Sequence, residues 1–199
     1  MYTGIIAGTA PILNIIKGAS IRTLSVDLSG FDEGLEIGAS VSLDGVCMTV
    51  VGIESGRVDF DAISETLERT TLSDRSAGDF LNVERSMRLG DELGGHILSG
   101  HVMATAEILE FGIVGEGVNL RISTPDDCGP YILEKGFIAI DGMSLTVGEC
   151  DEESFSLHII PETLRITTID RKVAGDRVNI EIDSRTQAIV ETMLRMGKS

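Results

Sequence analysis

The sequence repeats itself over about half its length, and this repeat limits the fold more than any other feature. The segment DGVCMTV at 44–50 returns as DGMSLTV at 141–147, a separation of 97 residues (141 − 44) in a chain of 199. With the same offset, ETLERTT at 65–71 returns as ETLRITT at 162–168. A period this long does not suit a solenoid, and it predicts two similar domains.

The repeat continues towards both ends of each half. AGDFLNVE at 77–84 matches AGDRVNIE at 174–181 without a gap, whereas TGIIAGTAPIL at 3–13 matches SGHVMATAEIL at 99–109 with an offset of 96. One residue has therefore been inserted or lost between the two matching blocks. The correspondence is long enough to pair residues of the two halves one by one.

Each half has the pattern of β structure. RVDFDAI at 57–63 alternates apolar and polar residues, and SFSLHII at 154–160 does the same. Short strands separated by Gly, Asp and Ser favour a small antiparallel barrel. We therefore expect a mainly β protein with one barrel over 1–92 and a second over 93–185.

The final segment, 186–199, has a different pattern. Ile189, Met193 and Met196 recur at helical intervals and predict an amphipathic helix of about 14 residues. A helix of this length is marginal on its own, so its apolar stripe needs a cover. Either the chain's own barrels or another chain can supply it.

Composition excludes several classes of function. The formal net charge is −16, from 32 acidic and 16 basic residues, which argues against nucleic-acid binding. The N-terminus lacks the basic region of a signal peptide, and no apolar run approaches the roughly 20 residues of a membrane span. Three cysteines, Cys47, Cys128 and Cys150, give no disulfide framework, and with three histidines they show no metal-ligand spacing. We expect a reduced, cytoplasmic protein without a metal, and Cys128 and Cys150 as structural residues.

Several motifs, in order and at matching spacing, carry a resemblance to a known family. They are MYTGII at 1–6, DGVCMTV at 44–50, GGHILSGH at 94–101, KGFIAIDGMSLTV at 135–147 and IIPETL at 159–164. Together they resemble riboflavin synthase, the homotrimeric type with duplicated barrels. The resemblance covers nearly the whole chain.

The resemblance implies a fold and a reaction. The fold is two tandem six-stranded antiparallel Greek-key barrels followed by a trimerisation helix over 186–199. The reaction is the dismutation of two 6,7-dimethyl-8-ribityllumazine molecules, in which a four-carbon unit moves from one to the other to give riboflavin and 5-amino-6-ribitylaminopyrimidinedione. No metal or redox cofactor is implied, and lumazine synthase is a candidate partner. Two related pockets would hold two identical substrates face to face, so much of the rate effect would come from positioning.

The resemblance also assigns catalytic roles to Cys47, Ser40 and His101. Cys47 would assist by hydrogen bonding or proton transfer at the substrate of the first barrel, and Ser40 would stabilise a nucleophile adding to the acceptor ring. His101 would transfer a proton or bind the ring. Residue type alone leaves structural roles open for each of these residues, such as a buried thiol or a turn serine.

A larger set matches the family's ligand-contacting positions. It comprises Tyr2, Thr3, Gly4, Ile5, Ile6, Met48, Thr49, Asp61, Ala62, Ser64, Thr66, Val102, Met103, Lys135, Asp141, Ser144, Leu145, Thr146, Ile160, Thr163 and Asp183. Tyr2 departs from the family, which usually has Phe there, and its hydroxyl needs a partner if it is buried. His96 is the weaker histidine candidate, and His158, on the polar side of its strand, is expected at the surface.

Two alternatives remain at this stage. A lumazine-carrying antenna protein has the same fold and binds its ligand without turnover, but it keeps only one good pocket. A flavin-reductase-type barrel needs a nicotinamide site, which the sequence does not show. One substrate gives and the other receives, so the pockets must differ, and Cys47 opposite Ser144 is our hypothesis for that difference.

Overall fold

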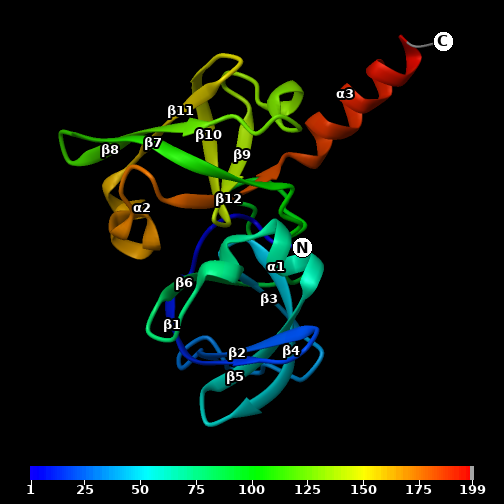
Figure 1. The fold of residues 1–199 in the computed structure, drawn as a ribbon, viewed down its shortest axis with the longest axis vertical. Helices are drawn as coiled ribbons and strands as arrows, with labels where there is room; N and C mark the ends of the chain where they lie inside the picture. The colour runs from blue at the N-terminus through cyan, green and yellow to red at the C-terminus, as the bar shows by residue number, and fades with distance from the viewer. Residues whose placement is uncertain (198–199) are drawn as a thin grey trace.

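The computed structural model describes residues 1–197 and contains two closed six-stranded barrels, one above the other, with a helix projecting from the second (Figure 1). The first barrel is formed by β1 (Gly8–Lys17), β2 (Ile21–Asp27), β3 (Ser40–Leu43), β4 (Val46–Glu54), β5 (Arg57–Ile63) and β6 (Phe80–Arg85). The second is formed by β7 (Ala104–Val114), β8 (Gly117–Ser123), β9 (Phe137–Ile140), β10 (Met143–Cys150), β11 (Ser154–Ile159) and β12 (Arg177–Ile182).

The two barrels have one topology. Around the first, the strands follow the order β1-β2-β5-β4-β3-β6, and replacing each strand by its repeat counterpart gives the order of the second. All pairings between the strands are antiparallel. The expected tandem barrels are therefore confirmed.

Short helices follow the same duplication. In the first half, α1 (Ser64–Arg69) and the 3₁₀ turn η1 (Thr71–Asp74) connect β5 to β6. In the second half, α2 (Pro161–Ile166) and η3 (Thr168–Arg171) connect β11 to β12, and η2 (Gly129–Tyr131) has no counterpart. Pro161 occupies the first turn of α2, where its missing N–H costs nothing.

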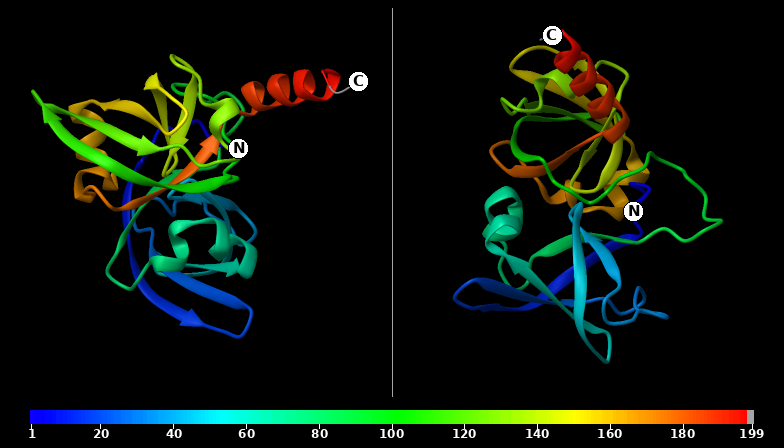
Figure 2. Two further views of the ribbon diagram at one scale, coloured as in Figure 1. Left: turned by 45° about the horizontal axis from the view of Figure 1, so that its top comes forward. Right: turned by 90° about the vertical axis from the view of Figure 1, so that its right-hand side faces the viewer.

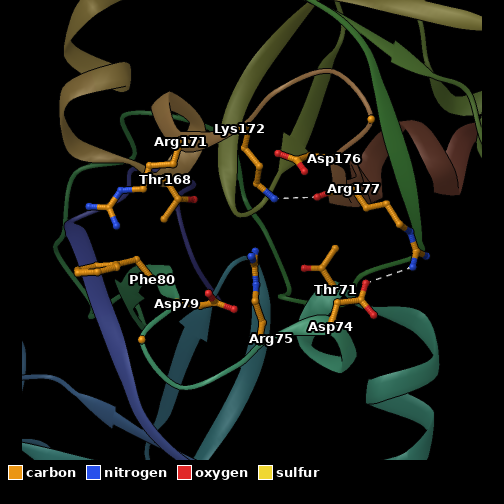
Figure 3. Close-up of a pocket in the computed structure, with 12 residues that line it drawn as sticks. Thr71, Asp74, Arg75, Asp79, Phe80, Thr168, Arg171, Lys172, Asp176 and Arg177 are labelled. Atoms are coloured by element: carbon orange, nitrogen blue, oxygen red, sulfur yellow. Dashed lines mark hydrogen bonds and ion pairs between the residues drawn. The ribbon is translucent and has the colours of Figure 1, made fainter.

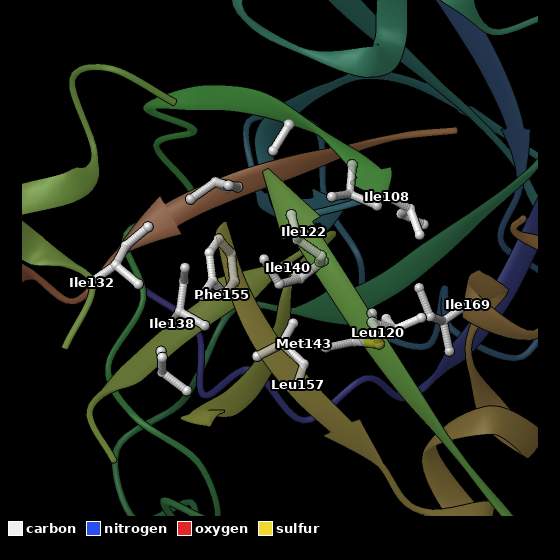
Figure 4. Packing of buried hydrophobic residues seen from close by; sticks show 14 of the residues in the cluster. Ile108, Leu120, Ile122, Ile132, Ile138, Ile140, Met143, Phe155, Leu157 and Ile169 are labelled. Carbon is white, nitrogen blue, oxygen red and sulfur yellow. The ribbon is translucent and has the colours of Figure 1, made fainter. Parts of the chain in front are cut away.

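Alternation along the strands decides which residues enter the barrels. On β5, Val58, Phe60 and Ala62 are fully buried, whereas the residues between them face outwards. In the second barrel, Phe155 and Leu157 of β11 pack in the same way, among isoleucines of the neighbouring strands (Figure 4). The interiors are filled with side chains, so a ligand can bind only outside the barrels.

The barrels meet through reciprocal contacts between equivalent residues. Asn82 donates to the Asp141 carbonyl (2.9 Å) and accepts from the Thr168 N–H (2.8 Å). Asn179, its counterpart, donates to the Asp44 carbonyl (2.8 Å) and makes the matching bond with the first barrel. The interface thus has an approximate twofold symmetry that the sequence repeat dictates.

Buried charges lie beside these asparagines. Asp44 binds Arg75 at 2.7 Å, and Asp141 faces Lys172 at 3.5 Å. Burial raises the pKa of Asp44, with a further contribution from the nearby Asp141 charge, while Arg75 opposes the shift. Both basic residues border a cavity of about 550 Å³ that the two barrels line together (Figure 3).

The turns at the centre of this interface require glycine. Gly45 and Gly142 have φ values of 80° and 82°, in the left-handed region that glycine tolerates. A Cβ on Gly45 would lie 2.6 Å from the Gly142 nitrogen, and a Cβ on Gly142 would lie 2.9 Å from the Gly45 nitrogen. The two turns therefore pack backbone to backbone.

Each barrel is completed by the segment that precedes the other barrel. Tyr2 and Leu98 pair backbone to backbone, at 2.9 and 3.0 Å, where the two segments pass each other. Beyond this crossing, Ile6 enters the core of the second barrel, and Val102 packs against the core of the first. The two barrels therefore share parts and are not independent modules.

The C-terminal helix α3 (Ser184–Met196) begins at Asp183, whose side chain accepts from the Arg185 and Thr186 N–H groups. It extends away from both barrels (Figure 2). No helix within residues 1–197 is long and apolar enough to cross a membrane. The last two residues of the expected helical segment 186–199 lie outside the described residues.

Candidate functional site

The second barrel has a cavity of about 300 Å³ on its outer face. Its lining consists of Lys135, Ser144, Leu145, Thr146, Val147, Gly148, His158, Ile160 and Thr163. Six of these residues belong to the predicted ligand-binding set: Lys135, Ser144, Leu145, Thr146, Ile160 and Thr163. The polar groups come from β10, β11, α2 and, for Lys135, the turn before β9, because outward-facing residues of neighbouring strands share one surface.

The first barrel carries the equivalent residues on the equivalent face. Ser40 pairs with Thr49 across β3 and β4, and Asp61 faces outwards on β5. In contrast, the side chains of Met48 and Ala62 lie inside the barrel at 3% and 0% exposure. Of the predicted ligand contacts, these two can therefore reach a ligand only through their backbone.

Cys47 forms hydrogen bonds with residues of the two segments that precede the barrels. Its N–H donates to the Gly100 carbonyl at 2.8 Å, and its sulfur accepts a hydrogen bond from the Tyr2 hydroxyl at 3.2 Å. Tyr2 is almost fully buried, and burial raises the pKa of its hydroxyl, with the Cys47 contact adding to the shift. The hydroxyl therefore stays protonated and has the partner that the sequence could not supply.

Ser144 is held in the symmetric way but by a different side chain. Its N–H donates to the Gly4 carbonyl at 2.8 Å, and its Oγ lies 2.6 Å from Nδ1 of His96. The His96 ring stacks on Phe137, with 5.0 Å between centroids. Burial lowers the pKa of His96, so the neutral ring is favoured.

In the sequence, His96 is the weaker histidine candidate, although in the structure it contacts Ser144. Met1 has Ile97 as its counterpart in the second half. His96 therefore lies just before the repeated segment and has no equivalent in the first half. Its Nε2 is buried without a hydrogen-bond partner among the described residues. That lack of a counterpart was the only signal in the sequence that could have singled it out.

Lys135 has a backbone conformation that marks it as unusual. Its φ is 64°, a region that costs a residue with a side chain of the order of 1 kcal/mol. Its counterpart in the first barrel is Gly38, with φ at 90° and the same backbone hydrogen bond across the barrel. The second barrel therefore retains a strained lysine at its pocket where the first barrel has glycine.

The protein has close relatives that decide its family. The family model for the lumazine binding domain matches residues 3–86 and 99–183. Riboflavin synthase of Escherichia coli (strain K12) is 46% identical over 198 residues, covering 98% of this chain and 93% of that protein. Riboflavin synthase of Buchnera aphidicola subsp. Schizaphis graminum (strain Sg) is 44% identical over 200 residues, covering 100% and 96%. The chain belongs to the riboflavin synthase family.

Membership in the riboflavin synthase family makes the protein an enzyme, as predicted. A crystal structure of LumP complexed with riboflavin has the same fold, with a TM-score of 0.85, 26% identity and coverage of 92% of this chain and 99% of that one. The antenna alternative of the sequence analysis is therefore less well supported than the enzyme, because the full-length relatives are named for a synthase.

The three predicted catalytic residues come from neighbouring segments of the chain. Cys47 and Ser40 lie on β4 and β3 of the first barrel. His101 is exposed and follows Gly100, whose carbonyl accepts from the Cys47 N–H, so the segment that carries His101 passes beside Cys47. His101 also borders a cavity of about 430 Å³, whose other lining residues are Ser99, Val102, Met103, Glu181, Ile182, Ser184 and Gln187.

Two predicted acidic residues of the enzyme have other partners. Asp141 is fully buried between the barrels, where its Oδ1 accepts from the Asn179 N–H at 2.7 Å. Asp183 caps α3, and hydrogen bonds from Thr186 lower its pKa although burial opposes them. We attribute Asp141 to the barrel interface, whereas Asp183 lies close enough to His96 to influence its charge.

Proposed function

We propose that the chain converts two 6,7-dimethyl-8-ribityllumazine molecules into riboflavin and 5-amino-6-ribitylaminopyrimidinedione. One lumazine loses a four-carbon unit and the other gains it, so atoms balance without an external oxidant or reductant. The observation that carries the proposal is the pair of equivalent pocket faces that differ at Cys47 and Ser144. Equivalent faces suit identical substrates, and the difference suits their unequal roles.

Incubation with the lumazine alone tests this function. The purified protein, without added metal, nicotinamide or flavin and with a chelator present, should give riboflavin. Chromatography should show two lumazines consumed for each riboflavin formed. Another ratio, or loss of activity on chelation, would contradict the dismutation.

The active site of the proposed enzyme lies between neighbouring subunits. The cavity that contains Ser144 is lined only by second-barrel residues, 135–163, among those described. A second lumazine must therefore be delivered by another surface, and the first barrel of a neighbouring chain, with Ser40 and Cys47, is the complementary one. His101 would enter the site together with that first barrel, because the preceding Gly100 binds Cys47 of the same chain.

The exposed face of α3 supports an assembly of three chains. Ile189, Met193 and Met196 are 62%, 68% and 72% exposed, so the stripe is not covered by the chain's own barrels. The other side of the helix is anchored, because Glu191 accepts from the Tyr131 hydroxyl and Val190 packs on the second core. Equivalent helices of two further copies are the occupants we propose for the stripe.

Truncation after Thr186 tests the assembly. Light scattering should give mostly monomer, and riboflavin formation should be lost while riboflavin still binds. Ile189→Glu should act similarly with the full chain, whereas Glu191→Gln, on the anchored side, should leave the trimer intact. A monomeric but fully active protein would place the site within one chain.

The proposal extends to the location and partners of the protein. Three free cysteines fit a reducing cytoplasm. Association with lumazine synthase is a further prediction, and co-sedimentation of the two purified proteins would test it.

A further inference from the structure

His158 occupies the position in the second barrel that Asp61 occupies in the first. Each residue lies 97 positions from the other, faces outwards on its strand, and binds its cross-strand neighbour. Asp61 accepts from the Thr23 hydroxyl at 2.6 Å, and Nδ1 of His158 lies 2.6 Å from Oδ1 of Asn119. The framework is therefore duplicated, whereas the group presented outwards is not.

The contact with Asn119 orients the ring of His158. In the tautomer in which Nδ1 donates to Oδ1 of Asn119, Nε2 is an acceptor. Gly148 leaves room in front of it, since a Cβ on Gly148 would lie 3.4 Å from Nε2. A ligand donor can therefore approach Nε2 from the cavity.

His158 stands where two cavities join. The 300 Å³ cavity that contains Ser144 shares Lys135, Gly148 and His158 with an adjoining cavity of about 770 Å³. The larger cavity presents more polar groups than the smaller one, among them Glu110, Asn119, Arg121, Glu134, Glu149 and Ser156, beside the apolar Phe111, Val114 and Leu120. Of the two cavities, the larger therefore suits hydroxyl groups better, and the smaller suits a flat heterocycle, which needs apolar contact.

We propose that His158 is a further substrate-binding residue, at which the ribityl chain of the lumazine bound to the second barrel leaves the smaller cavity for the larger one. This rests on the proposed function. The heterocycle lies against Ser144 and Thr146, and a chain hydroxyl donates to Nε2 of His158 beside Lys135. The equivalent hydroxyl in the first barrel donates to the Asp61 carboxylate.

The two pockets thereby recognise the same chain with different groups. The first presents a carboxylate at Asp61 and no side chain at Gly38, whereas the second presents an imidazole and the Lys135 ammonium. An ammonium offers three donors and no acceptor, so with Nε2 it can engage a hydroxyl that both donates and accepts. The same chain would then be held in two environments of opposite charge.

Binding of two ligands that differ only in the chain tests the proposal. Riboflavin carries the ribityl chain, and lumiflavin has the same isoalloxazine ring with a methyl group in its place. With His158→Ala, fluorescence titration of the full-length protein should show riboflavin bound about 10-fold more weakly at half of its sites, the loss expected for one hydrogen bond. Lumiflavin affinity should change less than about twofold, because no chain contact is lost.

Matched variants separate the role from a loss of folding. His158→Gln retains an acceptor and should restore most riboflavin affinity, and Asp61→Ala should weaken the other half of the sites instead. Glu116→Gln, in the exposed β7–β8 turn, should change neither ligand's affinity, and circular dichroism should be unaltered in all four variants. In the wild type, the ¹⁵N resonance of His158 Nε2 should shift with riboflavin and not with lumiflavin.

The outcomes distinguish this inference from the proposed function. Wild-type protein that forms riboflavin, together with unchanged riboflavin affinity in His158→Ala or an equal loss for both ligands, would overturn the role of His158 alone. Wild-type protein that forms no riboflavin from the lumazine would overturn the proposed function, whatever the variants do.

Discussion

The two barrels are alike where they hold the fold and unlike where they face a ligand. Their strand order, their glycine turns and the asparagine contacts between them are matched in both halves. Four differences lie on the outward pocket faces, as Gly38 and Lys135, Ser40 and Phe137, Cys47 and Ser144, and Asp61 and His158, whereas the interface keeps the charge where Lys172 replaces Arg75. The two halves therefore keep the same architecture but present different chemical groups at their pockets, as a reaction between two identical substrates requires.

The largest effect should come from removing the difference at Cys47. Cys47→Ser makes the first pocket resemble the second, so turnover should fall on the order of 100-fold, about 2.7 kcal/mol of transition-state stabilisation. Riboflavin affinity should stay within about threefold, because a hydroxyl and a thiol fill similar space. Steady-state kinetics and fluorescence titration measure the two quantities.

Cys150→Ser is the matched control for the thiol. Cys150 packs against the second core, and its sulfur lies 3.8 Å from the Ile132 carbonyl. This variant should keep nearly full turnover with a small loss of stability. If both serine variants lost turnover equally, Cys47 would be only a core residue.

The next largest effect, a loss of stability, should be equal in the two halves. Asn82→Ala and Asn179→Ala each remove two hydrogen bonds across the interface and leave buried backbone groups unpartnered, so each should lower the free energy of unfolding by about 2–4 kcal/mol. Urea denaturation measures the loss. Asn14→Ala, at an exposed position of β1, should cost less than about 0.5 kcal/mol. If the losses of stability differed widely between Asn82 and Asn179, the two contacts would share their geometry but not their contribution to stability.

A smaller effect, a dependence of the free energy of unfolding on pH, should come from His96, which has no counterpart in the first half. Burial lowers the pKa of His96 below its ordinary 6.5, so the unfolded chain takes up a proton at higher pH than the folded protein. The stability contributed by neutral His96 is therefore fully present above about pH 6.5 and is lost as pH falls through the lower folded value. The stability of wild type relative to His96→Gln should therefore fall as pH decreases below about 6.5.

Urea titrations at several pH values would measure this slope. Tyr2 makes the contact with Cys47 that His96 makes with Ser144. Its hydroxyl stays protonated throughout this range because burial raises its pKa. Tyr2→Phe should therefore retain the wild-type dependence on pH. A wild-type slope in His96→Gln would mean that another group is responsible.

The smallest effect should come from the hydroxyl of Tyr2. Tyr2→Phe removes the hydrogen bond to the Cys47 sulfur but keeps the ring, so stability should change by about 0.5–1 kcal/mol. Turnover should stay within about threefold, since the ring is retained and the Gly100 contact still holds the Cys47 backbone. Thermal unfolding and kinetics on one preparation measure both. A loss approaching that of Cys47→Ser would make the hydroxyl part of the chemistry.

Much of the fold was predictable, because the repeat and the strand alternation are local properties of the sequence. The pocket residues Ser144, Thr146 and Thr163 were also predictable from motifs. What the sequence did not predict are contacts made by the crossing segments, such as His96 with Ser144 and Tyr2 with Cys47. They depend on how two barrels meet, which no periodicity reports.

Two residues show how a motif can mislead about position. Asp141 stands in a repeated DG pair beside pocket residues, yet the turn directs its carboxylate into the interface, where it faces Lys172. His158 was expected at the surface, and it is exposed, but the surface there forms part of two cavities. The exposure of a residue in a single chain does not distinguish a solvated residue from one that binds a ligand.

The crossing of the two N-terminal segments also sets an order of events during synthesis. Ile6 is synthesised long before its partners, yet it packs into a core that includes Val178 and Ile180. At 5–20 residues per second, those partners follow roughly 9–35 s later. The first barrel likewise needs Val102, which is synthesised after its last strand. The segment around Ile6 can therefore reach its final place only after the strands of the second barrel have been made.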